Sequence, residues 1–299
     1  MAQKKASMMG IKRENTLGLA LIAPSVVLIL LIAIVPVVQT FLYSLRYYNL
    51  ADPMNERFIG LENYITLFSD TKFYDNFKNT MFFAVCTVSL QLIIGLLGAM
   101  LMNKVTRGVS FVRAAVLIPY AIPGVVVAQM FSFLFNGDFG AVNAILQQVG
   151  VLQTAFPFLA KPGWAMFVII LTNTWKQFPF VALMLLSGLQ TIPRELYESA
   201  DVDGANALRQ FLSITLPGIK PMILVVLLFR TMGDIRIFDL VYAMTGGGPA
   251  NTTSTMLYQA YIYLFKDMNF GMGSAWSTVI FAIILTISLI YNKLFKSDD

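Results

Sequence analysis

Histidine is absent from the 299 residues of this chain, cysteine occurs once, at Cys86, and charged residues make up only 12%. The absence of histidine excludes a His-dependent metal site and His-dependent acid–base catalysis, and one cysteine excludes a disulfide within the chain. The charge content is about half of that usual for a soluble globular protein. Cys86 lies in an apolar run, and we interpret it as a small packing residue.

Hydrophobic residues, by contrast, make up 57% of the chain, which is the composition of a membrane protein. The net charge is +5. Its basic residues are scattered between apolar runs rather than clustered on one face, so no nucleic-acid partner is expected. The basic N-terminus resembles the front of a signal peptide, but the apolar run behind it is too long and lacks a cleavage pattern, so we expect a retained first span.

Six segments are long and apolar enough to cross a bilayer, which takes roughly 20 residues. They cover residues about 17–43, 79–103, 114–137, 163–190, 217–242 and 271–292. Prolines inside several of them are tolerated in lipid when neighbouring helices satisfy the freed backbone groups. The expected fold is an all-α polytopic membrane protein with six transmembrane helices, in which residues 17–299 form one domain after a tail of residues 1–16.

The distribution of lysine and arginine predicts the orientation, because cytoplasmic loops carry an excess of both. The basic residues gather in the N-terminal tail, in the turn between the second and third spans, and at the C-terminus: Lys4, Lys5, Lys12, Arg13, Lys104, Arg107, Arg113, Lys293 and Lys296. We therefore expect both termini in the cytoplasm. The loops of residues 46–78 and 136–162, and the loop after Thr245, are then outside, and "FIGLENYITLF" in the first of them predicts a short surface helix.

The segment of residues 191–217, between the fourth and fifth spans, is a polar insert that the topology places in the cytoplasm. Pro193 suits the first turn of a helix, and the carboxylates of Glu195 and Glu198 favour the positive end of the helix dipole. A turn is expected at Gly204, after which helical spacing resumes. Leu216-Pro217 is expected to end this second helix at the start of the fifth span.

Two interpretations of the insert compete on the residues alone. One is an amphipathic loop on the inner leaflet, and the other is a surface that docks a protein. Membrane-surface helices usually carry lysine and arginine on the polar face, whereas the carboxylates here outnumber the basic residues Arg194 and Arg209. This composition favours a docking surface.

The stretch "ESADVDGANALRQFLSITLP" resembles the "EAA" loop of binding-protein-dependent ABC importers. The family spacing is Glu, two small residues, three residues, Gly, nine residues and Ile-x-Leu-Pro, and Ser199 in place of alanine is the one departure. The flanks "NTWKQFPFVALMLLSGLQTIPRELYE" and "IFDLVYAMTGGGPANTTSTMLYQAYIY" are similar to the maltose-type branch of carbohydrate-uptake permeases. The resemblance covers nearly the whole chain.

The resemblance implies a type I ABC importer permease in the cell membrane, working with a second homologous permease subunit, two cytoplasmic ATPase subunits and an extracytoplasmic solute-binding protein. The ATPases would bind ATP and magnesium, and this chain would bind no cofactor and no metal. The insert would be the coupling helix that the ATPase receives. Its motif and anchor residues are Glu198, Ser199, Ala200, Asp203, Gly204, Leu208, Phe211, Ile214, Leu216 and Pro217.

Ionisable residues inside spans are costly and suggest function by default. Lys176 lies near the middle of the fourth span beside Trp175, whose ring could stack on a sugar, although snorkelling and packing explain these two residues equally well. Arg230 and Asp234 lie on one helical face, where they either neutralise each other or contact a solute. Asn173 and Gln177 are further polar candidates for the substrate path.

The sequence "TGGGP", which contains Gly246, Gly247, Gly248 and Pro249, is not a phosphate loop, because no Gly-Lys-Ser/Thr follows it. We expect a flexible outer turn that contacts the binding protein or forms part of an outer gate. The predicted function is thus sugar import as a permease subunit without catalysis of its own. The alternative is an ion-coupled secondary transporter that uses the charges within the spans.

Overall fold

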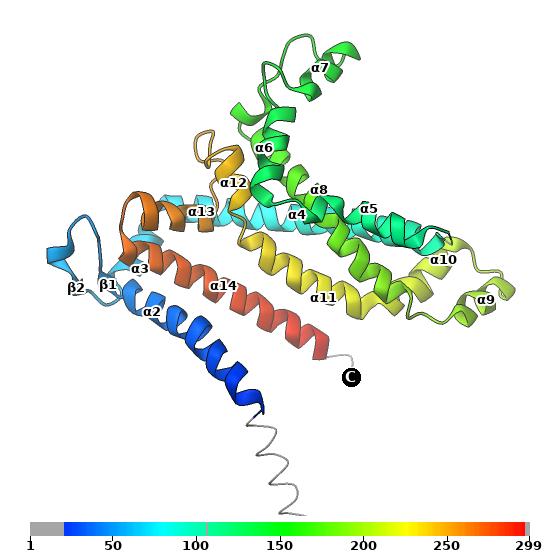
Figure 1. Ribbon diagram of the computed structural model, residues 1–299, viewed down its shortest axis with the longest axis horizontal. Helices are drawn as coiled ribbons and strands as arrows, with labels where there is room; N and C mark the ends of the chain where they lie inside the picture. The colour runs from blue at the N-terminus through cyan, green and yellow to red at the C-terminus, as the bar shows by residue number, and fades with distance from the viewer. Residues whose placement is uncertain (1–20, 106, 297–299) are drawn as a thin grey trace, which may run out of the picture.

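The computed structural model describes residues 21–105 and 107–296 of the chain, and nearly all of its regular structure is helical (Figure 1). The long elements are a helix over Leu21–Ser44, which contains the π turn η1 (Leu30–Ile34) and α2 (Val35–Ser44), followed by α4 (Thr71–Lys104), α5 (Val109–Ala121), α6 (Gly124–Leu134), α8 (Trp164–Leu189), α11 (Leu216–Ile235) and α14 (Phe270–Lys296). The predicted tail of residues 1–16 and the first four residues of the first predicted span lie outside the described residues.

Short elements connect the long helices. They are β1 (Arg46–Tyr47), η2 (Pro53–Asn55), β2 (Arg57–Phe58), α3 (Glu62–Ser69), α7 (Ala141–Gln148), η3 (Phe158–Ala160), α9 (Arg194–Val202), α10 (Ala207–Gln210), η4 (Phe211–Thr215), α12 (Asp239–Met244), α13 (Met256–Tyr261) and η5 (Ile262–Lys266). The two strands form a small antiparallel hairpin, with Arg46 opposite Phe58. α3 is the short helix expected after the first span.

Within the described residues, five helices are long and apolar enough to cross a membrane, or six if α5 and α6 together make one span. This confirms the predicted polytopic all-α fold. α8 is the most enclosed span, since 56% of its most apolar 18-residue stretch is buried. It packs against α4, α5 and α11. The first helix is the least enclosed, because 0% of the corresponding stretch is buried, and Figure 1 shows this helix splayed away from the bundle beside α14.

The third predicted span, residues 114–137, is not one continuous helix. α5 ends at Ala121, Ile122 is extended, and α6 begins after Pro123 at an angle of 85° to α5. The residue before a proline is biased away from the helical conformation, which explains the break. Figure 1 shows α6 leaving the layer of long helices and carrying an arm that includes α7.

Two other spans have boundaries that differ from the prediction. α4 begins at Thr71, eight residues before the predicted start, because the side chain of Asp70 caps the helix by accepting a hydrogen bond from Lys72 N at 2.9 Å. α11 ends at Ile235 rather than near residue 242, and a non-helical link separates it from α12. The side chain of Ile237 in this link is buried in the core.

Candidate functional site

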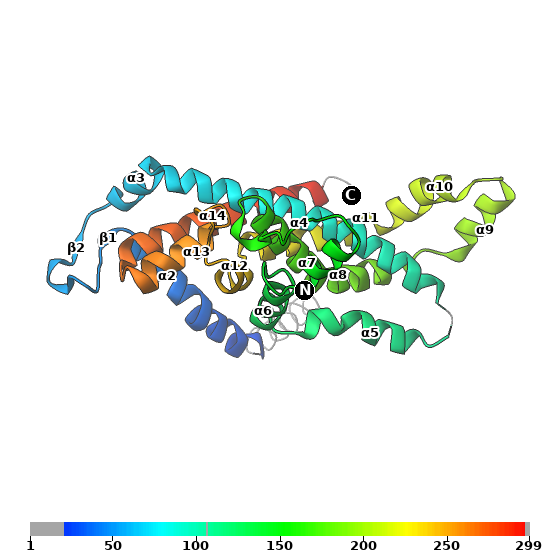
Figure 2. The same ribbon diagram turned by 90° about the horizontal axis from the view of Figure 1, so that it is seen from above.

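The polar insert forms a helical hairpin at one end of the molecule. Pro193 caps α9, Asp203 ends it, and Gly204 has a φ of +71°, which is the left-handed conformation that glycine adopts most readily. α10 then begins after Asn206, whose side chain accepts a hydrogen bond from Arg209 N at 2.9 Å. Figures 1 and 2 both show α9 and α10 projecting beyond the other helices. The expected turn at Gly204 is confirmed.

Side-chain hydrogen bonds hold the two arms of this hairpin together. Gln210 Nε2 donates to Asp201 Oδ1 at 2.5 Å and to Ala205 O at 3.1 Å. The hydroxyls of Tyr197 and Thr215 are hydrogen-bonded at 2.9 Å. These bonds tie α9 to the start of the fifth span.

The hairpin does not end at Leu216-Pro217 as predicted. α10 continues through the π turn η4 into α11, and together they form one helix over Ala207–Ile235. Leu216 N donates to Phe211 O across the widened turn. π turns of this kind interrupt the usual ladder of backbone bonds, so Pro217 is accommodated without a break, and the second arm of the hairpin continues as one helix into the span.

The predicted motif residues divide between the surface and a groove. Glu198, Gly204 and Leu208 are exposed, and Leu208 is 66% exposed. Phe211, Ile214 and Leu216 are partly buried. A groove of about 460 Å³ lies between α9 and α10, with Ser199, Ala200, Asp203 and Ile214 among its lining residues.

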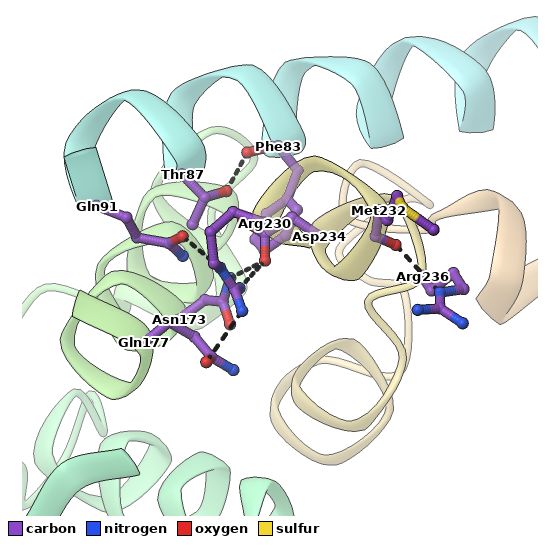
Figure 3. Close-up of polar contacts among 9 residues, drawn as sticks. All are labelled: Phe83, Thr87, Gln91, Asn173, Gln177, Arg230, Met232, Asp234 and Arg236. Atoms are coloured by element: carbon purple, nitrogen blue, oxygen red, sulfur yellow. Dashed lines mark hydrogen bonds and ion pairs between the residues drawn. The ribbon is translucent and has the colours of Figure 1, made fainter. Parts of the chain in front are cut away.

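A buried polar cluster joins three spans (Figure 3). Arg230 Nη2 lies 2.5 Å from Asp234 Oδ1 on the same face of α11, and their side chains are only 10% and 2% exposed. Arg230 Nε donates to Gln91 Oε1 on α4 at 2.8 Å, and Nη1 donates to Gln177 Oε1 on α8 at 3.1 Å. Asn173 Nδ2 donates to Asp234 Oδ1 at 3.0 Å.

This geometry is that of a structural ion pair whose donors and acceptors are shared among α4, α8 and α11. Mutual neutralisation of Arg230 and Asp234 therefore explains the pair, and contact of these residues with a solute stays a prediction. Gln91 is a member of the cluster that sequence reasoning missed. Little in the sequence marks Gln91 as a member of a cluster, because one uncharged amide in an apolar run is a common feature of membrane helices.

Lys176 and Trp175 lie outside this cluster. Lys176 Nζ donates to Tyr120 O at 3.4 Å and lies 5.7 Å from the centre of the Tyr120 ring. The Trp175 ring packs against Phe131 in the core, with centroids 5.4 Å apart, so its contacts are those of a packing residue. Tyr120, at the end of α5, is a further residue that the sequence analysis did not single out.

Several hydrogen bonds hold the "TGGGP" turn, which was expected to be flexible. Thr253 Oγ1 donates to Gly248 O at 2.6 Å and pairs with Thr245 Oγ1 at 2.8 Å. Tyr258 Oη donates to Gly246 O at 2.8 Å. Burial raises the pKa of the Tyr258 phenol, so its hydroxyl keeps its proton.

Contacts with α4 also anchor the segment after the turn, since Asn79 Nδ2 donates to Ser254 O at 3.0 Å and Thr80 Oγ1 accepts from Met256 N at 2.9 Å. Gly246 and Gly247 have positive φ, whereas Gly248 precedes Pro249 through a cis peptide bond. The side chains that follow, Thr253 to Thr255, are fully buried or nearly so. Across the described residues, no group of three or more acidic or cysteine side chains could hold a metal ion.

The family comparison decides what kind of protein this is. The model of the family described as "Binding-protein-dependent transport system inner membrane component" matches residues 91–295, which is more than half of the chain. The chain belongs to this family. The matched region contains the hairpin and all the residues of the buried polar cluster.

The sequences of related permeases align with this chain over almost its whole length. It is 38% identical to the trehalose/maltose transport system permease protein MalF of Thermococcus litoralis, with 96% of each chain covered. It is 37% identical to the sulfoquinovosyl glycerol transport system permease protein SmoG of Agrobacterium fabrum, with 96% of this chain and 92% of that protein covered. A bacterial alginate ABC transporter, solved in complex with an alginate pentasaccharide-bound periplasmic protein, contains a chain that matches with a TM-score of 0.80 and 25% identity, covering 96% of both chains.

Proposed function

We propose that the permease is one of two membrane subunits of an ATP-driven importer, which moves a di- or oligosaccharide from an extracytoplasmic binding protein into the cytoplasm by alternating access. The observation that carries this proposal is the exposed hairpin with the family spacing, which continues as a rigid helix into α11. Relatives that transport trehalose and maltose support a sugar as the solute.

The chain itself performs no catalysis in this account. ATP and magnesium are bound by two cytoplasmic ATPase subunits, which receive the hairpin in a cleft. Glu198 is the charged contact, and Leu208 enters the cleft as an apolar anchor because it is exposed on the hairpin. Closure of the ATPases on ATP then moves α9, and the Tyr197–Thr215 hydrogen bond helps to transmit this motion to α11.

The orientation follows from the same assignment. The helical hairpin of α9 and α10 and both termini lie in the cytoplasm. The strand pair β1–β2, the arm with α7 and the "TGGGP" turn lie outside, where the binding protein docks. The hydrogen-bonded turn of residues 245–255 gives that docking surface a fixed shape. The solute passes beside Lys176 on α8, and the Arg230–Asp234 cluster holds the walls of the path together.

The alternative of an ion-coupled secondary transporter would use Arg230, Asp234 and Arg236 as a charge relay. The hydrogen bond between Arg230 and Asp234, and the partners of Arg230 on α4 and α8, argue against this role for the pair, because a relay needs groups that are free to exchange protons or ions. The alternative also gives no function to the acidic hairpin.

The experiment is sugar-stimulated ATP hydrolysis by the complete transporter in lipid, measured with Glu198→Lys and Gly204→Pro. Both variants are expected to stay in the membrane and to lose most of the stimulation, because the first reverses the charged contact and the second cannot adopt the positive φ of residue 204. Glu62→Lys, at the start of α3, is the matched charge-reversal control and keeps the stimulation. Normal stimulation in both hairpin variants would refute the proposal.

A further inference from the structure

The short helix α3 carries an exposed apolar stripe along one side. Leu61 lies just before its first turn, and Ile65 and Phe68 follow at intervals of four and three residues, which is the spacing of one helical face. The three side chains are 64%, 66% and 46% exposed. They therefore form a narrow apolar surface that the described part of the chain leaves open.

The other two sides of α3 have different surroundings. Glu62, Thr66 and Ser69 repeat the same spacing one residue later, and all three are exposed. Asn63 and Leu67 are buried against the rest of the protein. With 3.6 residues per turn, α3 thus has a polar side, a side packed on the bundle and an open apolar side. A helix that lies where protein, water and lipid meet needs these three sides.

Hydrogen bonds place the start of α3 at the end of a span. Asn63 Nδ2 donates to Ser44 O at 2.8 Å, and the hydroxyls of Tyr64 and Ser44 are hydrogen-bonded at 2.6 Å. Ser44 is the last residue of the apolar helix Leu21–Ser44. Since this helix spans the bilayer, its end lies at the bilayer boundary, and α3 lies there with it. Figures 1 and 2 show α3 at the end of the molecule opposite the hairpin of α9 and α10.

Aromatic contacts place the far end of α3 at the same level. The ring centroids of Phe68 and Phe73 are 5.0 Å apart, and that of Phe73 lies 5.5 Å from that of Trp276. Trp276 is in the second turn of α14, whose span begins at Phe270. Tyr74, which is 56% exposed, donates from its hydroxyl to Phe68 O at 3.0 Å. Tyrosine and tryptophan are enriched at membrane–water interfaces, so these contacts also put α3 at the boundary.

We propose that α3 is an interfacial helix whose stripe of Leu61, Ile65 and Phe68 inserts into the lipid at this boundary, which in the proposed orientation is the outer leaflet. Lipid fits the stripe better than a protein does, because the stripe is level with the ends of two spans, whereas a stable protein interface takes about 20–30 residues a side. Glu62 is the one charged residue of α3, so the attachment is apolar and needs no anionic lipid. Through its bonds to Ser44, the anchored helix holds the end of the first span, the least enclosed one, beside the bundle.

Spin labels at neighbouring positions test the proposal in the complete transporter, reconstituted into vesicles of phosphatidylethanolamine and phosphatidylglycerol. Ile65→Cys and Thr66→Cys are each labelled with a nitroxide in a Cys86→Ala background. Collision rates are measured with oxygen, which concentrates in lipid, and with a water-soluble nickel chelate. The oxygen-to-nickel ratio is expected to be several-fold higher at Ile65 than at Thr66, and vesicles of phosphatidylcholine alone should give the same difference.

Thr66→Cys is the matched control, because it lies one residue away on the polar side. Equal ratios at the two positions would place the stripe in water, and low collision rates with both agents at Ile65 would mean that a protein covers it; either result overturns the proposal. If a labelled variant does not assemble, Ile65→Trp and Thr66→Trp in the unaltered background replace it. Brominated lipid is then expected to quench the tryptophan at position 65 more strongly, and equal quenching overturns the proposal. Sugar-stimulated ATP hydrolysis of each variant reports separately on the transport function.

Discussion

Replacing Asp234 by alanine should leave a buried, uncompensated charge in the middle of the bundle. Asp234 is 1% exposed, and Arg230 has its other hydrogen bonds on two further helices, so Arg230 cannot turn toward solvent without breaking them. The loss of one partner of a buried, hydrogen-bonded pair costs about 3–5 kcal/mol. Asn173, which donates to the same carboxylate, loses its acceptor as well.

Two further variants separate the charge effect from the loss of packing. Replacing both charged residues by apolar ones of similar volume, Arg230→Met with Asp234→Leu, should cost far less than Asp234→Ala, because no unpaired charge remains. Glu56→Ala removes the exposed partner of Arg46, an ion pair with an N–O distance of 2.9 Å and side chains 47% and 39% exposed. Such surface pairs contribute about 0–1 kcal/mol, so this control should change stability little.

The assay is the free energy of unfolding of the purified permease in mixed micelles, from denaturant titrations followed by tryptophan fluorescence. The account predicts a large loss for Asp234→Ala, partial or full recovery in the double variant, and almost no change for Glu56→Ala. A loss below about 1 kcal/mol for Asp234→Ala would show that the pair is solvated, which would refute the structural role of the cluster.

Three smaller predictions concern the loops. Gly204→Ala places a Cβ on a residue with a φ of +71° and no other atom within 4 Å, so the cost is backbone strain of about 1 kcal/mol, seen as faster amide exchange in residues 194–216. Asn206→Ala removes the cap of α10 and should destabilise the hairpin by about 1 kcal/mol in the same exchange measurement. Asn143→Ala leaves Phe156 N, now donating to Asn143 Oδ1 at 2.8 Å, without this partner, and should speed proteolysis of residues 136–162. Exchange or proteolysis equal to wild type would contradict each prediction.

The spans and the hairpin could be predicted from sequence because each depends on local signals. Long apolar runs predicted the helices, and Pro193, Gly204 and the carboxylates predicted the hairpin. The break in the third span was the main miss. Pro119 and Pro123 both lie in that run, and α5 contains Pro119 without ending there. Both prolines carry the same local bias, so no local pattern predicts which of them ends the helix; in the structure Asp239 lies against Gly124 at the start of α6.

The buried polar cluster, too, depends on contacts between helices that the local sequence does not predict. The four-residue spacing of Arg230 and Asp234 places both on one helical face, which made their pairing one of the two interpretations drawn from the sequence. The partners Gln91 and Gln177 come from other helices, and no local pattern brings residues of different spans together. The hydrogen bonds of residues 245–255 were missed for a similar reason, since the glycines suggested conformational freedom while Asn79 and Thr80 of α4 bond to the segment that follows them.

The energy source of uptake tests the central claim most directly. The complete transporter is placed in proteoliposomes with its binding protein and the labelled sugar of that binding protein outside, and with either ATP and magnesium or a proton or sodium gradient as the driving force. The account predicts accumulation of the sugar only with ATP on the side of the hairpin, and its loss in Glu198→Lys. Accumulation driven by an ion gradient without ATP would contradict it.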